Sequence, residues 1–599
     1  MSQTKPALVP GLGALPHNQG CSFRIWAPHA EAAYVTGTFN HWAERKTPMA
    51  REGEGYWSVD VRKAKIGDEY RYILVNGEQT LSRIDPWARQ VTNSVGNAVI
   101  HDAAFDWGND AEFPIPSLNE LVIYEMHIGT FARESADAPG TFTNAIQKLP
   151  YLKSLGINAI ELLPIAEFAG GISWGYNPAH PFAVESEYGG PKEFKEFVKA
   201  AHAHGIAVIL DVVYNHLGPS DLDLWQFDGW HENNQGGIFF YNDARSKTPW
   251  GDTRPDYGRA EVRQYLRDNA MMWIDEYHID GLRFDSVVNI RNAEGNNDDP
   301  ENDLPEGWSL LQWITSEVKA HKPMAFTIAE DLQANEFLTK KIDETGAGFD
   351  AQWEPQFLCA VRDAIAAFDD EHRDLARIQE SLLFNFNGDV FQRVIYTESH
   401  DDVAEGDVRI PEKISPGDAG NWFAKKRSTL GTVLTLTAPG IPMLFQGQEF
   451  LENQGFDDQQ PLDWSKAESY GGIMKLHADL LHLRLNRGGV SKGLIGQGIE
   501  ITHFDDANKV FAFHRWAEGG AKDSVLVVIN FSQQQLENYA LPVPQAGTWQ
   551  VRFNSDSDAY DAEFGNHGIA AITATVSEDE PLQSIIHLAP YSALILSQD

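Results

Sequence analysis

Two kinds of hydrophobic pattern alternate along this chain of 599 residues. Near both ends, at residues 22–75 and 510–596, short segments alternate apolar and polar side chains, and turn residues separate these segments. Such alternation is typical of strands with one buried face, so each end of the chain is expected to form a β-sandwich. Between the two ends, continuous apolar segments alternate with amphipathic ones, which predicts strands followed by helices.

The middle of the chain carries enough strand–helix units for a closed barrel. Helical patterns at residues 190–202, 261–276 and 421–434 follow apolar segments that are typical of fully buried strands. Eight such strands in this order predict a (β/α)8 TIM barrel. The predicted barrel strands are residues 121–125, 159–163, 207–213, 281–285, 325–330, 349–353, 394–398 and 442–445.

The predicted fold is therefore multidomain. An N-terminal β-sandwich is expected over residues 1–110, the barrel over residues 111–493, and a C-terminal antiparallel β-sandwich over residues 494–599. The segment at about 215–258 is too long for a plain connection, so it is interpreted as an irregular insertion beside the barrel mouth. We expect its aromatic side chains to approach that mouth: Trp225, Phe227, Trp230, Phe239, Phe240, Tyr241 and Trp250.

Polar side chains gather where the predicted barrel strands end. Arg283 and Asp285 are two residues apart, so both side chains leave the same side of a strand, and a guanidinium stabilises the ionised form of a neighbouring carboxylate. One such pair is usually structural, but four clusters at the ends of strands three, four, five and seven predict an active site on one face of the barrel. The clusters are Asp211 with Asn215 and His216, Arg283 with Asp285, Glu330, and His400 with Asp401.

Charge, cysteine content and the first residues limit which partners and which cellular location are expected. Acidic residues outnumber basic ones by 86 to 47, a formal charge of −39, which disfavours nucleic acid or an anionic membrane and fits a neutral substrate. Cys21 and Cys359 are far apart, so no disulfide framework is implied. Residues 1–20 lack the features of a signal peptide, and no apolar stretch is long enough to span a membrane. We expect a cytoplasmic monomer, or a secreted one if a signal has been removed.

The motifs at the strand ends resemble those of the α-amylase family of glycoside hydrolases. The resemblance rests on DVVYNH at residues 211–216, GLRFD at 281–285, IAE at 328–330 and SHD at 399–401, and WGYNP at 174–178 and GIPMLFQG at 440–447 agree with it. The FNHW sequence at residues 39–42 resembles a starch-binding-like module that precedes the barrel in some members. In that module Trp42, Trp57 and Trp87 are candidates for sugar stacking, although a tryptophan in so small a sandwich is more often core.

The resemblance implies a role for each site residue. Asp285 would be the nucleophile, Glu330 the general acid, and Asp401 would bind the sugar hydroxyls beside the scissile bond. Asp211 would hold Arg283, which in turn would orient Asp285. The other substrate-binding residues implied are Tyr176, His216, His400 and Trp174. The chemistry requires no cofactor; Asn215 matches a calcium ligand of many amylases, so a structural calcium is compatible with the resemblance.

The motifs leave the reaction open between branches of the family. The DVVYNH motif fits hydrolases and trehalohydrolases, whereas YTESHD at residues 396–401 looks like branching enzymes. We expect a retaining α-1,4-glucan hydrolase that acts on starch, glycogen or maltooligosaccharides and releases maltooligosaccharides. The alternatives are a 1,4-α-glucan branching enzyme and a maltooligosyl-trehalose trehalohydrolase. A non-catalytic glucan-binding protein is disfavoured because all three carboxylates are present.

Overall fold

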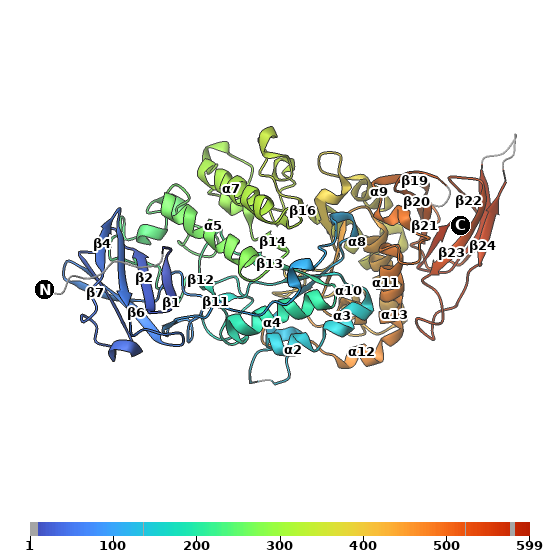
Figure 1. Ribbon diagram of the computed structural model, residues 1–599. Helices are drawn as coiled ribbons and strands as arrows, with labels where there is room; N and C mark the ends of the chain where they lie inside the picture. The colour runs from blue at the N-terminus through green and yellow to red at the C-terminus, as the bar shows by residue number, and fades with distance from the viewer. Residues whose placement is uncertain (1–9, 136, 521–522, 576–581) are drawn as a thin grey trace.

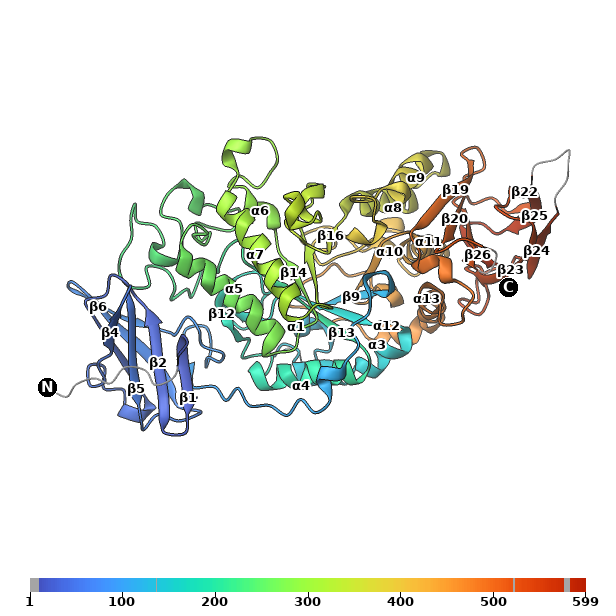
Figure 2. The ribbon, with the colours of Figure 1, turned by 45° about the horizontal axis from the view of Figure 1, so that its top comes forward.

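Three structural units follow one another along the molecule, with the barrel in the middle (Figures 1 and 2). The computed structural model describes residues 10–135, 137–520, 523–575 and 582–599. Part of the segment screened for a signal peptide, residues 1–9, lies outside the described residues. No helix in the described parts of the chain combines the length and the apolar character that a membrane crossing needs.

The N-terminal module, residues 10–107, is a sandwich of two antiparallel sheets, as predicted. Its Trp57 and Trp87 are 5% and 6% exposed and belong to the core, whereas Trp42 is 38% exposed. Only Trp42 of the three candidate tryptophans therefore offers a free ring face. One sheet has the order β1 (Gly13–His17), β2 (Gly20–Trp26), β5 (Tyr56–Val61), β4 (Ala50–Gly53), and the other contains β3 (Ala32–Gly37), β6 (Glu69–Asn76) and β7 (Gln79–Arg83), with β8 (Ala98–Val99) on β6.

The central unit is a closed parallel barrel built from all eight predicted strands. Their side chains are buried on both faces, which is why the strands read as mostly apolar segments. The largest boundary difference is in the seventh strand, which was predicted to end at residue 398 and ends at Ile395. In chain order the strands are β9 (Ile123–Met126), β10 (Ala159–Leu162), β13 (Ala207–Val212), β14 (Gly281–Phe284), β15 (Phe326–Ala329), β16 (Ala351–Trp353), β17 (Arg393–Ile395) and β18 (Ile441–Phe445).

Amphipathic helices surround the barrel. In α4 (Gly190–Ala203), Phe194, Phe197 and Val198 are buried at helical spacing, and Pro191 in the first turn fits the preset backbone angle of a helix start. The Asn421 side chain caps α11 (Trp422–Thr437) by accepting the Ala424 N–H at 2.9 Å. The other helices are α1 (Ile128–Phe131), α2 (Phe142–Ile146), α3 (Leu149–Leu155), α5 (Ala260–Asp275), α6 (Val287–Arg291), α7 (Pro305–His321), α8 (Pro355–Ala366), α9 (Leu375–Leu383), α10 (Ile410–Ile414), α12 (Ser465–Ser469) and α13 (Gly471–Arg484).

The insertion at residues 215–258 corrects one expectation. Its aromatic side chains were predicted to approach the barrel mouth, but Phe227, Phe239, Phe240 and Tyr241 are at most 1% exposed and pack in the hydrophobic core. Trp225 and Trp230 pack against the same core from partly buried positions. These rings fill the space between the N-terminal module and the barrel, so they are buried in the core and do not face the substrate. Trp250 alone of the named set lines the cavity at the mouth.

The C-terminal unit packs two antiparallel sheets, as predicted. It is joined to the barrel through α11, where the buried Lys426 ammonium lies 2.7 Å from the Asp556 carboxylate. The six-stranded sheet has the order β19 (Gly498–Asp505), β20 (Val510–Trp516), β21 (Val525–Asn530), β26 (Ser592–Ser597), β23 (Gly547–Asn554), β24 (Ala571–Ala574), and the second sheet pairs β22 (Leu536–Pro542) with β25 (Gln583–Leu588). Cys21 is buried in the N-terminal module, Cys359 is exposed on α8, and both are free thiols.

Candidate active site

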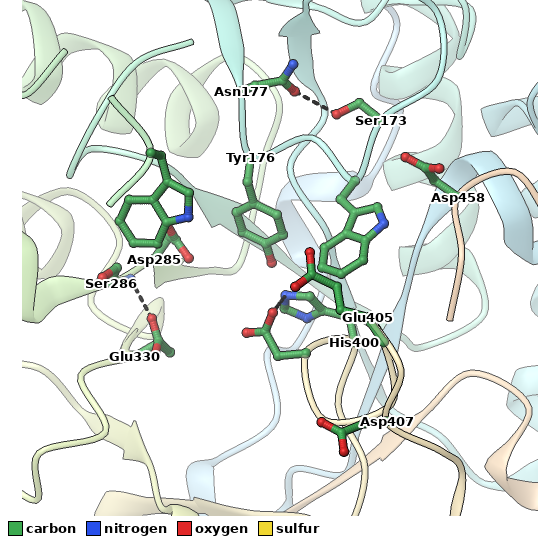
Figure 3. Close-up of a pocket in the computed structure, with 14 residues that line it drawn as sticks. Ser173, Tyr176, Asn177, Asp285, Ser286, Glu330, His400, Glu405, Asp407 and Asp458 are labelled. Atoms are coloured by element: carbon green, nitrogen blue, oxygen red, sulfur yellow. Dashed lines mark hydrogen bonds and ion pairs between the residues drawn. The ribbon is translucent and has the colours of Figure 1, made fainter. Parts of the chain in front are cut away.

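A cavity of about 540 Å³ opens at the carboxyl ends of the barrel strands. It brings together six of the nine predicted site residues: Trp174, Tyr176, Asp285, Glu330, His400 and Asp401. The other three, Asp211, His216 and Arg283, lie beneath the cavity wall and hold residues that line it. In Figure 3, Asp285, Ser286 and Glu330 occupy one side of the cavity and His400 the other, with Tyr176 between them. Ser173, Asn177, Trp250, Ser286, Ala404, Glu405, Asp407 and Asp458 complete the lining.

Arg283 connects the carboxylates of three barrel strands. Its guanidinium is fully buried and donates from Nη1 to Asp211 Oδ2 at 2.5 Å and to Asp285 Oδ1 at 3.1 Å. Its Nη2 lies 3.8 Å from Glu330 Oε2. A planar fork that reaches several carboxylates at once fixes their relative positions. Asp211 thus contacts Arg283, and Arg283 contacts Asp285, which is the arrangement that their predicted roles require; the roles themselves stay predictions.

Asp285 is also fixed from a second direction. The Asn215 amide nitrogen donates to Asp285 Oδ2 at 2.6 Å and to the Asp285 backbone carbonyl at 2.9 Å. The side chain is 12% exposed, so one edge remains open to the cavity. Two donors on a carboxylate that still faces the cavity leave it oriented and accessible, as a nucleophile requires.

The pKa of Glu330 lies far above the ordinary range of a carboxyl group. Burial raises its pKa to about 8, and Asp285 and Asp401 add to this effect while Arg283 opposes it. The Ser286 N–H donates to Glu330 Oε2 at 2.5 Å. Ser286 adopts a left-handed conformation at φ 40°, which is unusual for a residue with a side chain and aims that N–H at the carboxyl group. A carboxyl group that stays protonated near neutral pH suits a general acid.

His400 is held by a buried carboxylate at the end of the first barrel strand. Glu125 accepts from the His400 backbone N–H at 3.0 Å and from Nδ1 at 2.5 Å. Burial lowers the pKa of His400, but Asp401 and Glu125 outweigh it and raise the value to about 9. The charged imidazole lies 3.4 Å from the Asp401 carboxylate, which is 59% exposed at the cavity mouth.

Aromatic rings form the remaining wall. Tyr176 stacks on His400, with 5.0 Å between ring centroids, and its hydroxyl donates to Asp211 Oδ2 at 2.6 Å. His216 approaches the Tyr176 carbonyl at 2.8 Å through Nε2 and is covered by Trp250. His216 is 1% exposed, so in this structure it supports the wall and does not face the cavity.

Asn215 does not fit a calcium site here. Its amide nitrogen is committed to Asp285, and its oxygen contacts His216 Nδ1, so neither end of the side chain is directed to an ion. Within the described residues, one cluster of acids and histidine has metal-compatible spacing: Asp369, Glu371 and His372. All three are exposed and none lines the cavity.

Two residues with contacts to the site, Glu125 and Ser286, were not given a role from the sequence, and Trp250 was named without being singled out. Glu125 contacts His400 across 275 positions of sequence, a separation that no local pattern reveals. Ser286 follows Asp285 directly, but its positive φ has no signal in a serine. Trp250 was named only as one of seven aromatic residues, and the sequence could not distinguish it from the six that are buried or partly buried.

The fold is that of the (β/α)8 barrel class, and the cavity at the strand ends holds the carboxylates of Asp285, Glu330 and Asp401. Family models match the chain in three consecutive parts. They are carbohydrate-binding module 48 (isoamylase N-terminal domain) at residues 11–88, the alpha amylase catalytic domain at residues 126–226 and 223–475, and the alpha amylase C-terminal all-beta domain at residues 501–599. The chain belongs to the α-amylase family, and it acts on α-glucans.

Relatives with similar sequences carry branching-enzyme names. The chain is 32% identical over 572 residues to 1,4-alpha-glucan branching enzyme GlgB 2 of Xanthomonas oryzae pv. oryzae. The aligned region covers 92% of this chain and 78% of that enzyme. It is 30% identical over 580 residues to 1,4-alpha-glucan branching enzyme GlgB of Oceanobacillus iheyensis, which covers 92% and 88%.

Solved structures share the fold across nearly the whole chain. A putative alpha amylase from Salmonella typhimurium has a TM-score of 0.74 at 23% identity and covers 99% of this chain and 100% of its own. A pullulanase from Anoxybacillus sp. LM18-11, solved with maltotetraose, has a TM-score of 0.73 at 21% identity and covers 99% and 88%. At this level of identity the likeness concerns the fold alone.

Proposed function

We propose that this enzyme is a retaining 1,4-α-glucan branching enzyme, a glucanotransferase. The observation that carries the proposal is the similarity to named branching enzymes over 92% of the chain. Hydrolysis was the main expectation from the motifs, and the relatives support the branching alternative better. The geometry of the cavity is compatible with both, because the two reactions share their first step.

In that first step, the Asp285 carboxylate attacks the anomeric carbon while the glycosidic bond to the leaving chain breaks. The leaving oxygen takes the proton of Glu330, whose raised pKa keeps it protonated near pH 7. Arg283 and Asn215 hold the two Asp285 oxygens, so the nucleophile is oriented before substrate arrives. The product is a glycosyl group bonded to Asp285 and a released glucan end.

In the second step, Glu330 acts as base. It takes the proton from the 6-hydroxyl of an acceptor glucan, and the oxygen of that hydroxyl attacks the anomeric carbon and displaces Asp285. Two displacements at one carbon retain the α configuration. Asp401, exposed at the mouth and next to the charged His400, is proposed to bind the hydroxyls of the reacting sugar.

Hydrolysis remains a second candidate because of one observation. A transferase must hold an acceptor chain long enough to exclude water, which takes an extended binding surface. The aromatic residues of the insertion were expected at the mouth, where they could serve either reaction, but Trp250 alone of the seven lines the cavity. A small acceptor surface would allow water to take the place of the 6-hydroxyl.

The test is digestion of amylose followed by counting reducing ends and α-1,6 linkages. A branching enzyme forms about one α-1,6 linkage for each bond it cleaves and leaves the number of reducing ends nearly constant. A steep rise in reducing ends with few α-1,6 linkages would make the enzyme a hydrolase. Maltooligosyl-trehalose serves as a further substrate: release of free trehalose much faster than amylose is processed would identify a trehalohydrolase.

A further inference from the structure

Trp250 is exposed at the edge of the catalytic cavity. Its side chain is 44% exposed, although it lines the same cavity as Asp285 and Glu330. One face of the ring stacks on His216, with 4.7 Å between centroids and 16° between planes. Covering a large apolar ring removes its surface from water, which is favourable. A ring exposed in a polar cavity is therefore suited to a ligand with an apolar face.

The backbone presents Trp250 at the tip of a tight turn. Thr248 and Gly251 pair through both backbone N–H groups, at 2.8 and 3.3 Å. The chain on either side folds back on itself: the Asp256 N–H donates to the Phe239 carbonyl at 3.0 Å, and the Tyr241 N–H to the Arg254 carbonyl at 3.2 Å. The position of the turn therefore depends in part on where residues 239–241 are held. Arg254 also holds it, because its guanidinium donates to the carbonyls of Lys247, Asn292 and Ala293 at 2.6, 3.0 and 2.7 Å.

Residues 239–241 are held largely by aromatic packing, part of which comes from the N-terminal module. Phe239 lies edge-on to Trp26 at 5.9 Å and tilted to Trp87 at 6.5 Å, and both tryptophans belong to the module. Earlier in the insertion, Trp230 stacks on the module's His29 at 4.5 Å. These contacts bury rings from both units in one continuous core.

Polar contacts fasten the same stretch of the insertion to the module. The Arg83 guanidinium donates to the carbonyls of residues 225, 226 and 227 at 3.4, 2.9 and 2.9 Å. The buried Asp228 carboxylate accepts from the His29 backbone N–H at 2.9 Å and lies 3.0 Å from His29 Nδ1. The Asp223 carboxylate accepts from Arg71 at 2.6 Å. A guanidinium that satisfies three consecutive carbonyls fixes the backbone and not only a side chain.

We propose that Trp250 is a stacking platform for a glucose ring of the α-glucan, and that the N-terminal module takes part in substrate binding by holding the insertion that presents it. The C–H face of a glucose ring is apolar and matches the free face of the indole. The inference rests on the proposed function only for the class of substrate. Whether the acceptor is water or a glucan hydroxyl does not affect it.

The platform is tested by measuring maltoheptaose binding calorimetrically in the Asp285→Asn protein, which cannot turn the ligand over. Trp250→Ala is expected to weaken binding about tenfold, because the contact area of one ring face is lost. Trp250→Phe should restore part of the affinity. The control is Phe368→Ala, which removes an exposed aromatic ring outside the cavity and should leave the affinity unchanged. Unchanged affinity in Trp250→Ala, or an equal loss in Phe368→Ala, would overturn the proposal.

The role of the module is tested by Arg83→Met and Asp228→Asn, which lie outside the catalytic cavity. Both substitutions should weaken maltoheptaose binding, as Trp250→Ala does. Adding Trp250→Ala to either variant should reduce the affinity by a smaller factor than Trp250→Ala does on its own. Arg45→Met is the control, because this exposed arginine bonds within the module, to Thr80 at 3.1 Å. Wild-type affinity in both contact variants, or fully additive losses, would show that the module does not hold the platform.

A thermal unfolding curve for each variant ensures that binding is measured on folded protein. Failure of the platform is distinguishable from failure of the proposed function. Absence of α-1,6 linkages would refute branching and leave the binding results intact, since these are obtained without turnover.

Discussion

Glu330 is placed so that its charge state limits the pH range of the enzyme. Its pKa is raised to about 8, chiefly by burial and further by Asp285 and Asp401. The first step needs the protonated form, so kcat/KM should fall as the pH rises through about 8. A pH–rate profile on amylose measures this. A descending limb well below neutral pH would show that another group supplies the proton.

Removal of the negative charge of Asp401 should shift the descending limb of the pH–rate profile in a predictable direction. Asp401→Asn removes a negative charge that disfavours ionisation of Glu330, so the pKa of Glu330 should fall and the descending limb should shift to lower pH. Overall activity will also drop, because Asp401 is proposed to bind substrate. The position of the limb, measured on the residual activity, is the informative quantity. A shift to higher pH would contradict the electrostatic account.

Residue-level features were only partly predictable. The R-x-D spacing, the glutamate after the fifth strand and the histidine–aspartate pair all lie at strand ends, and strand ends are visible in the apolar pattern. The conformation of Ser286 was not predictable, because a positive φ in a residue with a side chain is imposed by its surroundings. The partners of Asn215 were not predictable either, since its side chain has donors and an acceptor and the sequence does not show which neighbour takes them.

At the scale of elements, β9 and β10 carry two glutamates at the same register with different environments. Glu125 pairs with Glu161 across the two strands. Glu125 bonds His400, whereas burial raises the pKa of Glu161 well above its usual range, and one oxygen of Glu161 has no partner among the described residues. Glu161 is therefore expected to be neutral near pH 7, while the charge of Glu125 raises the pKa of His400.

This difference gives a matched pair of variants. Glu125→Gln should lower the pKa of His400, so the imidazole loses its proton at lower pH and activity declines by about tenfold or more as the pH rises from 6 to 8. Glu161→Gln keeps both shape and charge and should leave the profile nearly unchanged. Equal effects of the two substitutions would mean that Glu125 acts only through packing. Profiles of kcat/KM against pH, with thermal unfolding as a check, separate the two cases.

The barrel elements were predictable from the sequence because they are buried on both faces. All eight strands were located, since continuous apolar runs followed by amphipathic helices leave few alternatives. The insertion was not predictable in the same way. Its aromatic residues have no periodicity. Their number indicated that they pack against a partner surface, but the sequence did not show whether this is the substrate or the N-terminal module.

At the scale of the whole molecule, the N-terminal module supports the barrel through apolar contacts. Trp87 lies edge-on to Tyr265 of α5 at 5.1 Å, and Trp26 lies edge-on to Phe239 of the insertion. Removal of residues 1–106 should therefore expose this surface, lower the yield of soluble protein and lower the unfolding temperature. A truncated protein that stays soluble and equally stable would contradict this supporting role. A loss of affinity for long glucans would not distinguish support from direct binding, because removal of the module also releases the insertion that presents Trp250.

The central claim, that Asp285 forms a covalent glycosyl-enzyme with Glu330 as acid and base, can be tested with the Glu330→Gln variant and α-maltosyl fluoride. Fluoride leaves without a proton from Glu330, so the first step proceeds, but the second step lacks its base. A maltosyl adduct should accumulate, visible by intact-protein mass spectrometry and mapped by peptide analysis to Asp285. The double variant with Asp285→Asn should form no adduct. An adduct on another residue, or release of product with inverted configuration and no adduct, would contradict the account.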